Sequence, residues 1–472
     1  MENLKKDDII ELNIEDIGAE GNGIGRYLGE LVVFVPGTVP GDNIKAKIRK
    51  KKKKFAEAKL LELTVPSPDR VKPECEYFGT CNGCKMQNTD YPKQLEIKRN
   101  IVKNAFIKIG GFESINIPGV IGSDDIYFYR NKLEFSFSND RWLTEEDMNR
   151  ENIDKSFALG YHIPGFNEKI LDINKCYLQS DFSNRILILT RDFFKSKGSS
   201  IYTTKTHSGY LRFLTVRRSV QSGEVMVNLI TYDYQPELIN EYAALLQKEI
   251  PEVSTFVNSL TQSKAQVALA DNFIVITGSG YITENIGGYD FKITPNTFFQ
   301  TNSKQCEKLF KTACDMAEFT GNENALDLYC GCGAISLYIS AKVKSVYGVE
   351  LSKESIEMAN DNALLNKVTN CGFKDMDVKD YLGMLTSPPT PLLKGEGGKA
   401  FEIFEIGKNK NLTSPPSPLL RGEGSKNSEF SGEGEKVTLT SPPSILLNGD
   451  DEKKIRCYYF RSAAKRHTSK GS

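Results

Sequence analysis

The residues with the clearest chemical potential lie between Ala325 and Ser340, where an apolar strand leads into a glycine-rich turn and then a helix. Gly331 and Gly333 allow the backbone to turn tightly, because glycine adopts conformations that other residues avoid. A second apolar strand follows and ends at Glu350, where a carboxylate can accept hydrogen bonds from both hydroxyls of a ribose. This pattern predicts a site for a nucleoside-type cofactor.

Two cofactors fit such a turn, and one residue helps to separate them. A dinucleotide fingerprint has glycine at the third position of G-x-G-x-x-G, but Ser336 stands there, which disfavours NAD. The motif D-x-Y-C-G-x-G, followed by a strand and an acid, resembles instead the S-adenosylmethionine site of class I methyltransferases. A glycine turn in some other α/β protein is the plain structural alternative.

A second group of reactive residues is the cysteine loop of Cys75, Cys81 and Cys84, spaced C-x5-C-x2-C. Three soft ligands on one loop need a fourth, and Cys176 is the remaining candidate in this half of the chain. Zinc usually takes its last ligands from a second closely spaced pair, whereas three clustered thiolates and one distant thiolate suit a [4Fe-4S] cluster. Zinc binding and inert buried thiols are the alternatives.

The chain is long enough to place these residues in separate domains. Its 472 residues, 39% of them hydrophobic, suffice for two or three cores. The 61 basic residues balance 61 acidic ones, so any nucleic-acid surface must be local. There is no apolar run of about 18 residues and no signal-peptide core, and ten cysteines are too few for a disulfide scaffold. We therefore expect a cytoplasmic protein without membrane contact, as a monomer.

The first 66 residues have the pattern of a small β-barrel. Four short strands are predicted between glycine-rich and proline-rich loops: Ile9–Ile14, Glu30–Val35, Asn43–Ile48 and Phe55–Leu63. Between Asn43 and Lys72 there are 11 basic and three acidic residues, a surplus that suits a phosphate backbone, although a solvated hairpin is the plain alternative. The strand order and the loops G-x-G-x-x-R and V-P-G-x-x-P-G-D resemble the TRAM domain of RNA-modifying enzymes, which implies RNA as a partner.

Four motifs in a fixed order carry a more specific resemblance. They are the cysteine loop, Y-R-N-K-x-E-F at Tyr129–Phe135, F-x-Q-x-N at Phe298–Asn302 and D-L-Y-C-G-x-G at Asp327–Gly333. From about residue 5 to 382 the chain resembles the RNA (uracil-5-)-methyltransferase family, notably its iron-sulfur members that act on 23S ribosomal RNA. Asn82 stands where that cysteine loop commonly has glycine, which leaves the ligand spacing intact.

The resemblance implies roles for particular residues. The expected S-adenosylmethionine contacts are Gln300, Tyr329, Glu350 and Asp377. The expected [4Fe-4S] ligands are Cys75, Cys81, Cys84 and Cys176. The amide of Gln300 can donate and accept at the amino-acid end of the cofactor, and Asp377, near a third strand end, can reach the adenine amine. As purely structural residues, Gln300 would neighbour a helix cap and Tyr329 would be a core aromatic.

The predicted fold class combines β and α/β architecture in four segments. Residues 1–66 form an OB-like TRAM barrel, 67–290 an α+β iron-sulfur and central domain, 291–384 a truncated Rossmann-like methyltransferase domain, and 385–472 a low-complexity tail. From Leu385 the tail repeats a unit rich in proline, glycine and serine every 27 residues. Such a composition cannot bury enough apolar surface to offset chain entropy, so we expect disorder there rather than a docking peptide or a solenoid.

The family reaction needs two groups that the sequence after the third strand does not supply. A cysteine thiolate adds to C6 of uracil so that C5 can take the methyl group, and a base then removes the C5 proton. We therefore predict no catalytic residue in this chain as written. With suitable synonymous codons, Arg456–His467 read one base later gives D-A-I-I-S-D-P-P-R-S-G, the strand and loop that the family has there, and we hypothesise a reading-frame shift.

Together these patterns predict an S-adenosylmethionine-dependent RNA uracil-C5 methyltransferase by ancestry that is inactive as written. Ribosomal RNA is favoured over transfer RNA as its substrate. The alternative from another class is a non-catalytic RNA-binding iron-sulfur protein, and a third hypothesis is a methyltransferase that acts elsewhere on RNA or on protein.

Overall fold

The computed structural model describes residues 4–81, 83–149, 151–166, 168–386, 444–448 and 456–459. The chain divides into two compact units, one that runs to Thr312 and one that begins at Ala313, within helix α5 (Ser303–Ala317). In the described part of the chain, no helix is both long and apolar enough to pass through a lipid bilayer.

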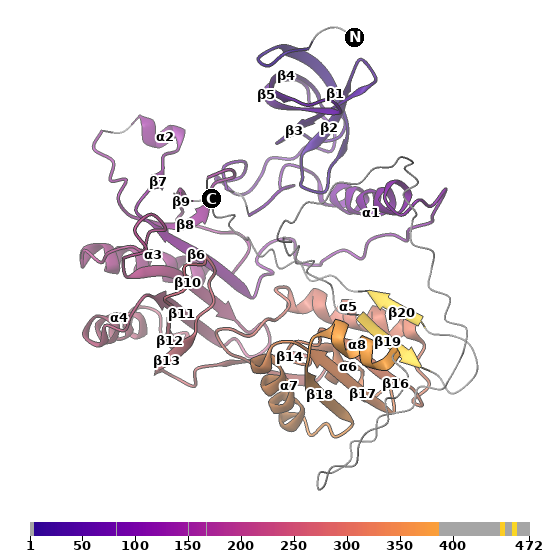
Figure 1. The fold of residues 1–472 in the computed structure, drawn as a ribbon. Helices are drawn as coiled ribbons and strands as arrows, with labels where there is room; N and C mark the ends of the chain where they lie inside the picture. Colours follow the sequence, from indigo (N-terminus) through magenta and orange to yellow (C-terminus); the bar gives the residue numbers. More distant parts are fainter. Residues whose placement is uncertain are drawn as a thin grey trace, which may run out of the picture. The chain divides into compact units, whose positions relative to one another are not determined.

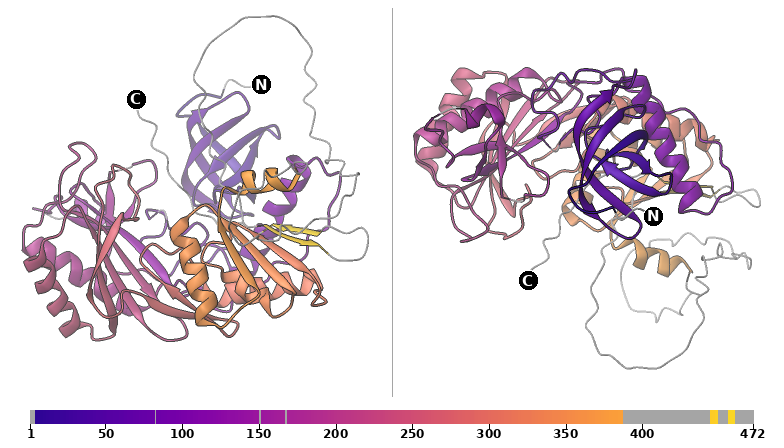
Figure 2. Two further views of the ribbon diagram at one scale, coloured as in Figure 1. Left: turned by 60° about the horizontal axis from the view of Figure 1, so that its bottom comes forward. Right: turned by 90° about the horizontal axis from the view of Figure 1, so that it is seen from above.

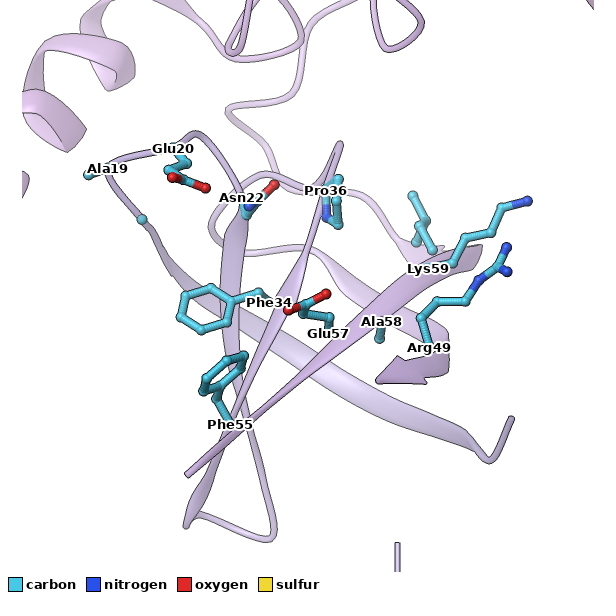
Figure 3. A pocket seen from close by; sticks show the side chains of 12 residues that line it. Ala19, Glu20, Asn22, Phe34, Pro36, Arg49, Phe55, Glu57, Ala58 and Lys59 are labelled. Carbon is cyan, nitrogen blue, oxygen red and sulfur yellow. The ribbon is translucent and has the colours of Figure 1, made fainter. Parts of the chain in front are cut away.

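Five strands of the first unit close into a barrel (Figures 1 and 2). They are β1 (Ile9–Ile17), β2 (Gly23–Tyr27), β3 (Leu31–Val35), β4 (Asn43–Lys51) and β5 (Phe55–Val65). Around the barrel their order is β1, β2, β3, β5, β4, and β4 pairs antiparallel with β1 to close it. Alternate residues point inward, since side chains alternate between the two faces of a strand. Val33, Val35, Ala56 and Ala58 are buried in the barrel core. On the outer surface, Phe34 and Phe55 of the neighbouring strands β3 and β5 line a hollow (Figure 3).

Strand β2 lies where the sequence analysis predicts a loop, and that prediction was wrong. The glycines that suggested a turn are needed inside the strand. A Cβ atom on Gly25 would lie 2.7 Å from the carbonyl oxygen of Asn13, and one on Gly23 would lie 1.9 Å from Thr38 Oγ1. Glycine within a strand often marks such a close approach. The other four strands begin within one residue of their predicted starts.

A buried carboxylate fixes one end of the barrel. Asp42 is fully buried and accepts hydrogen bonds from the amides of Val39 at 2.7 Å and Ser67 at 2.9 Å. It also pairs with the guanidinium of Arg70. Burial opposes the ionisation of Asp42, but the hydrogen bonds from Arg70, Ser67 and Val39 outweigh it and hold the pKa of this carboxyl below its ordinary value. Asp42 therefore ties the barrel to the segment that leads into the cysteine loop.

A mixed eight-stranded sheet forms the largest core of the first unit. Its strand order is β13, β12, β11, β10, β6, β8, β9, β7. The strands are β6 (Lys132–Ser138), β7 (Arg141–Trp142), β8 (Ala158–His162), β9 (Ile170–Asp172), β10 (Leu211–Arg218), β11 (Val225–Thr231), β12 (Val253–Leu260) and β13 (Asn272–Thr277). Helices α3 (Asp181–Ser196) and α4 (Pro236–Glu249) cover one face of it, where Phe194 and Tyr242 are buried (Figures 1 and 2).

Two further helices and a β-hairpin precede α5 in the first unit. Helix α1 (Tyr91–Lys108) follows the cysteine loop, α2 (Glu145–Met148) is a single turn, and β14 (Ile282–Ile286) pairs antiparallel with β15 (Tyr289–Ile293). This hairpin leads into the segment before α5, so it precedes the parallel strands of the second unit in the chain.

The second unit is built on a sheet with the strand order β18, β17, β16, β19, β20. Its three parallel strands are β16 (Asn324–Leu328), β17 (Ser345–Glu350) and β18 (Cys371–Asp375). A helix follows each strand in the chain: α6 (Ala334–Ser340), α7 (Lys353–Leu365) and α8 (Val378–Thr386). Parallel neighbours end at the same edge of a sheet, and ligands of α/β sheets bind at that edge.

Two short strands lie in the tail that the sequence analysis predicts without regular structure. β19 (Ser444–Asn448) pairs antiparallel with β16, and β20 (Arg456–Tyr459) pairs antiparallel with β19. The prediction was wrong for these two segments. An apolar stretch of the third repeat forms β19 by pairing with the free backbone groups at the edge of β16, and β20 then pairs with β19. The remainder of residues 387–472, on which the prediction of disorder falls, lies outside the described residues.

Candidate cofactor site and cysteine cluster

The glycine-rich turn after β16 has a constrained backbone. Tyr329, Gly331 and Gly333 have φ angles of 64°, 54° and 79°. A positive φ is uncommon for a residue other than glycine, and such strain is found at functional sites. The amides of Tyr329 and Cys330 donate to the carbonyl oxygen of Val349, at 2.7 and 3.1 Å. These bonds tie the turn to the neighbouring strand β17.

The carboxylate of Glu350 lies beside this turn at the end of β17. Its Oε2 accepts a hydrogen bond from the amide of Gly331 at 3.3 Å, and its Oε1 accepts one from the amide of Ser352 at 3.0 Å. The side chain is half-buried. A carboxylate has about four acceptor positions, so Glu350 retains capacity for two further donors, such as the hydroxyls of a ribose.

Asp377 and Tyr329 lie at the same edge of the sheet. Asp377 is exposed between β18 and α8, and its Oδ1 accepts a hydrogen bond from the amide of Lys379 at 2.8 Å, as a helix-capping residue does. The ring of Tyr329 is partly buried against an apolar cluster that includes Leu328 and Val349. The structure thus brings three of the four predicted cofactor residues to the carboxyl edge of three adjacent strands: Tyr329, Glu350 and Asp377.

Gln300 lies in the first unit, between β15 and α5. Its backbone oxygen accepts a hydrogen bond from Asn131 Nδ2 at 2.7 Å, and its side chain is half-buried. Asn131 Nδ2 also donates to Ser303 Oγ at 2.9 Å, and Ser303 Oγ donates to the buried Glu284 at 2.6 Å. This network fixes the backbone that carries Gln300 at the start of α5.

A buried pair below the turn was missed by the sequence analysis. Asp327 on β16 is fully buried, and its Oδ2 accepts a hydrogen bond from Ser336 Oγ at 2.6 Å. No group of the described residues forms a hydrogen bond with its Oδ1. Burial raises the pKa of Asp327 to about 7, and the negative charge of Glu350 adds to the shift while the Ser336 hydrogen bond opposes it. Two features of the sequence could have indicated this pair. Asp327 is an acid within an apolar strand, and Ser336, nine residues later, replaces the glycine of a dinucleotide site.

The four predicted cluster ligands all lie in the first unit and are free thiols. Cys75, Cys81 and Cys84 are half-buried on their loop, and Cys176 is buried between β9 and α3. The amide of Asn174 donates to the hydroxyl of Tyr77 at 3.2 Å, which joins the loop to the segment of Cys176. Cys81 and Cys84 also pack against the core that contains Cys176.

Burial disfavours ionisation of three of the four thiols and raises the pKa values of Cys75, Cys81 and Cys176. Burial raises the pKa of Cys75 to about 11 and that of Cys81 to about 12, and both shifts include contributions from Cys84 and Cys176. Among the described residues, however, no three His, Cys, Asp or Glu side chains are grouped closely enough to hold a metal ion.

Comparison with known proteins supplies the class of the chain. Residues 209–386 match the family model described as tRNA (Uracil-5-)-methyltransferase, and residues 6–61 match the TRAM domain. An uncharacterised RNA methyltransferase of Chlorobaculum tepidum is 39% identical over 384 residues, which is 80% of each chain. A second, from Bacteroides thetaiotaomicron, is 38% identical over 371 residues, 78% of this chain and 81% of its own.

One solved structure supports the same assignment. The tRNA (uracil-54, C5)-methyltransferase of Pyrococcus abyssi, in complex with S-adenosyl-L-homocysteine, is similar with a TM-score of 0.57 and 26% sequence identity, over 77% of this chain and 79% of that chain. Fold and relatives therefore place the chain among the RNA methyltransferases. More narrowly, the chain belongs to the RNA (uracil-5-)-methyltransferase family and carries an N-terminal TRAM domain.

Proposed function

We propose that the chain is by ancestry a methyltransferase for uracil C5 in RNA, with ribosomal RNA as the RNA partner, and that its second unit binds S-adenosylmethionine. The observation that carries the proposal is the carboxyl edge of β16, β17 and β18, where the constrained turn, Glu350 and Asp377 meet. In this proposal Glu350 accepts from the ribose hydroxyls, Asp377 accepts from the adenine amine, and Tyr329 lies against the cofactor. The role expected for Gln300, at the amino-acid end of the cofactor, stays a prediction. The solved relative with bound S-adenosyl-L-homocysteine supports the choice of cofactor.

Binding of S-adenosyl-L-homocysteine tests the cofactor assignment. The chain should bind this product, measured by calorimetry, and Glu350→Gln should weaken binding about 10-fold, because hydrogen bonds to a charged acceptor contribute ~1.5–3 kcal/mol. Glu354→Gln is the matched control, since Glu354 is exposed on the first turn of α7 and the substitution removes the same charge. A parent chain that does not bind, or equal weakening by both substitutions, would contradict the assignment.

We further propose that Cys75, Cys81, Cys84 and Cys176 hold a [4Fe-4S] cluster. The chemistry of the donor set supports the proposal, because all four residues are free thiols and Cys81 and Cys84 pack against the core that contains Cys176. A cluster places four iron atoms between its ligands, so its thiolates stand further apart than those around one ion. Bound there, the cluster would join the cysteine loop to the segment of Cys176.

Iron content tests the cluster proposal. The full chain, purified without oxygen, should be brown, absorb broadly near ~400 nm and contain about four iron atoms per molecule. Cys81→Ser should lose most of the iron, whereas Cys371→Ser, which alters a half-buried thiol on β18 of the second unit, should keep it. A colourless protein with stoichiometric zinc would rule the cluster out.

The proposed chemistry stops at cofactor and RNA binding in the chain as written. The match to the family methyltransferase model runs to residue 386, and we assign neither the attacking thiolate nor the base to any residue before it. We therefore propose that the chain binds cofactor and RNA but does not transfer the methyl group. Its non-catalytic alternative, an RNA-binding iron-sulfur protein, would keep the barrel and the cysteines without binding the cofactor.

A further inference from the structure

One edge of strand β16 is a surface that another strand can join. β16 pairs in parallel with β17 on one side, and on its other side it pairs antiparallel with β19 along its whole length. In a doubly wound sheet the place beside the first strand belongs to the fourth parallel strand. Here β18, β17 and β16 follow the order of such a sheet, but the strand beside β16 runs in the opposite direction and comes from the repeat tail. The backbone of β16 thus accepts a strand supplied from far along the chain.

Left uncovered, this edge would present a row of unpaired backbone groups. The segment Asn324–Leu328 contains one charged residue, Asp327, and its side chain is fully buried. Exposed charges and prolines are the usual means by which an edge strand avoids pairing with another chain, and this strand has neither. The edge of β16 therefore needs a strand to cover it.

The covering strand β19 belongs to the third of the three repeats in the tail. Its sequence, S-I-L-L-N, corresponds to T-P-L-L-K at 390–394 in the first repeat and to S-P-L-L-R at 417–421 in the second. Pro391 and Pro418 stand where the third repeat has Ile445, and the remaining differences fall at the first and last positions of the strand. Within the strand the third repeat thus differs from the other two by a backbone N–H group.

The N–H group of Ile445 faces a neighbouring strand whichever way it points. Ile445 pairs with Asp327 of β16 on one side of β19 and with Tyr458 of β20 on the other. In an antiparallel ladder a residue exchanges hydrogen bonds with one of its two opposite neighbours, so this N–H is directed at β16 or at β20. Proline has no N–H and is therefore confined to edge strands, strand starts and bulges. At this position a proline would remove a hydrogen bond from a strand that is paired on both sides.

We propose that the edge of β16 is a strand-binding surface that rejects proline, and that the third repeat of this chain is its occupant. Ile445 supplies the N–H group that Pro391 and Pro418 lack. The kind of partner that fits is an extended apolar segment, because the hydrogen bonds come from the main chain of β16. The inference is independent of the proposed cofactor, RNA and cluster.

Hydrogen exchange of the full chain, measured on peptides, tests the strand-binding surface. Peptides that cover β16 and residues 444–448 should be protected in the parent. Ile445→Pro should speed exchange in both by about 10-fold or more, because it removes a hydrogen bond from a doubly paired strand. Ile445→Val is the matched control, since it keeps the N–H group and a β-branched side chain, and exchange should stay unchanged. Continued protection of β17 and β18 in Ile445→Pro would show that the second unit remains folded.

A second variant moves the occupant from one repeat to another. Adding Pro418→Ile to Ile445→Pro should restore the protection of β16 and shift protection in the tail from 444–448 to 417–421. The second repeat can reach the same edge, because the entropy of loop closure depends only weakly on loop length. Such a gain of protection cannot arise from a folding defect.

Three results would overturn the proposal. They are fast exchange of residues 444–448 in the parent, unchanged exchange of β16 in Ile445→Pro, and a double variant in which β16 stays unprotected. The first would show that the third repeat does not occupy the edge, and the other two that proline does not decide which segment binds there.

Discussion

With its reading frame restored after Lys454, the chain is expected to be an active methyltransferase, whereas the chain as written is expected to be inactive. Transfer of a labelled methyl group from S-adenosylmethionine to unmodified RNA should rise by roughly 10⁴-fold or more, because a nucleophile and a base that act together lose nearly all activity when both are absent. With suitable synonymous codons, the segment from Arg456 read one base later would begin with D-A-I-I-S-D-P-P, which resembles the strand and loop that the family has there.

The thiols of the described residues give a structural reason for the expected inactivity. Cys306, Cys314, Cys330 and Cys332 are all buried. Burial raises the pKa of Cys330 far above its usual range and that of Cys371 to about 12. A thiol with so high a pKa stays protonated at neutral pH, and the thiolate is the form that attacks. Cys330 and Cys371 are therefore poor candidates for addition to uracil C6.

The assay needs two RNA substrates and one site control. Ribosomal and transfer RNA, each unmodified, should be offered separately to the chain as written and to the frame-restored chain, and we expect ribosomal RNA to be methylated. The frame-restored chain with Glu350→Gln should lose activity through weaker cofactor binding. Equal activity of the written and restored chains would mean that a residue before Leu385 performs the attack, and the frame-shift hypothesis would then be wrong.

Periodicity and spacing predicted the parts of the fold that depend on local pattern. Alternating apolar residues located four of the five barrel strands, and the glycine turn between Leu328 and Ala334 was placed between a strand and a helix. Strand β2 was missed because its glycines are required by the close approach of Asn13 and Thr38, which lie elsewhere in the chain. A glycine required by a distant neighbour looks the same in sequence as a glycine required by a turn.

In the candidate sites, too, spacing predicted some features and tertiary packing decided the others. Three cysteines could be grouped from their spacing, but the place of Cys176 against them depends on how the loop packs on the core. Phe34 and Phe55 could not be recognised as a surface pair, because their outward direction follows from strand phase and from the pairing of β3 with β5. The hydrogen bond from Ser336 to Asp327 also depends on tertiary structure, since the turn folds α6 back over the strand.

The buried Asp327 should make the second unit less stable as the pH rises. Its pKa is raised from 3.8 to about 7 in the folded chain, so the folded state holds a proton that the unfolded state has released. The contribution of the protonated Asp327 to the free energy of unfolding is complete below pH ~4. It falls by up to ~1.4 kcal/mol per pH unit and is lost once the pH passes the folded pKa. The total change is on the order of 4 kcal/mol.

Replacing Asp327 by asparagine should remove this pH dependence of the stability. Asp327→Asn cannot ionise, and its side-chain oxygen can still accept the hydrogen bond from Ser336 Oγ. Above pH ~7 the variant should be more stable than the parent, since the parent then buries a carboxylate whose Oδ1 finds no partner in the part of the chain that the structure describes. Asp361→Asn, at an exposed acid on α7, is the matched control and should leave the dependence unchanged.

Hydrogen exchange of peptides from β16 and β17, corrected for the intrinsic effect of pH on exchange, measures this local stability. Protection in the parent should fall between pH 5 and pH 8, values that bracket a folded pKa raised by burial, while protection in Asp327→Asn should stay level. Glu350→Gln should retain most of the fall, because burial is the largest cause of the shift and the charge of Glu350 is a smaller one. Equal slopes for the parent and Asp327→Asn would show that Asp327 is already ionised at pH 5, and that solvent or another group reaches its Oδ1 atom in solution.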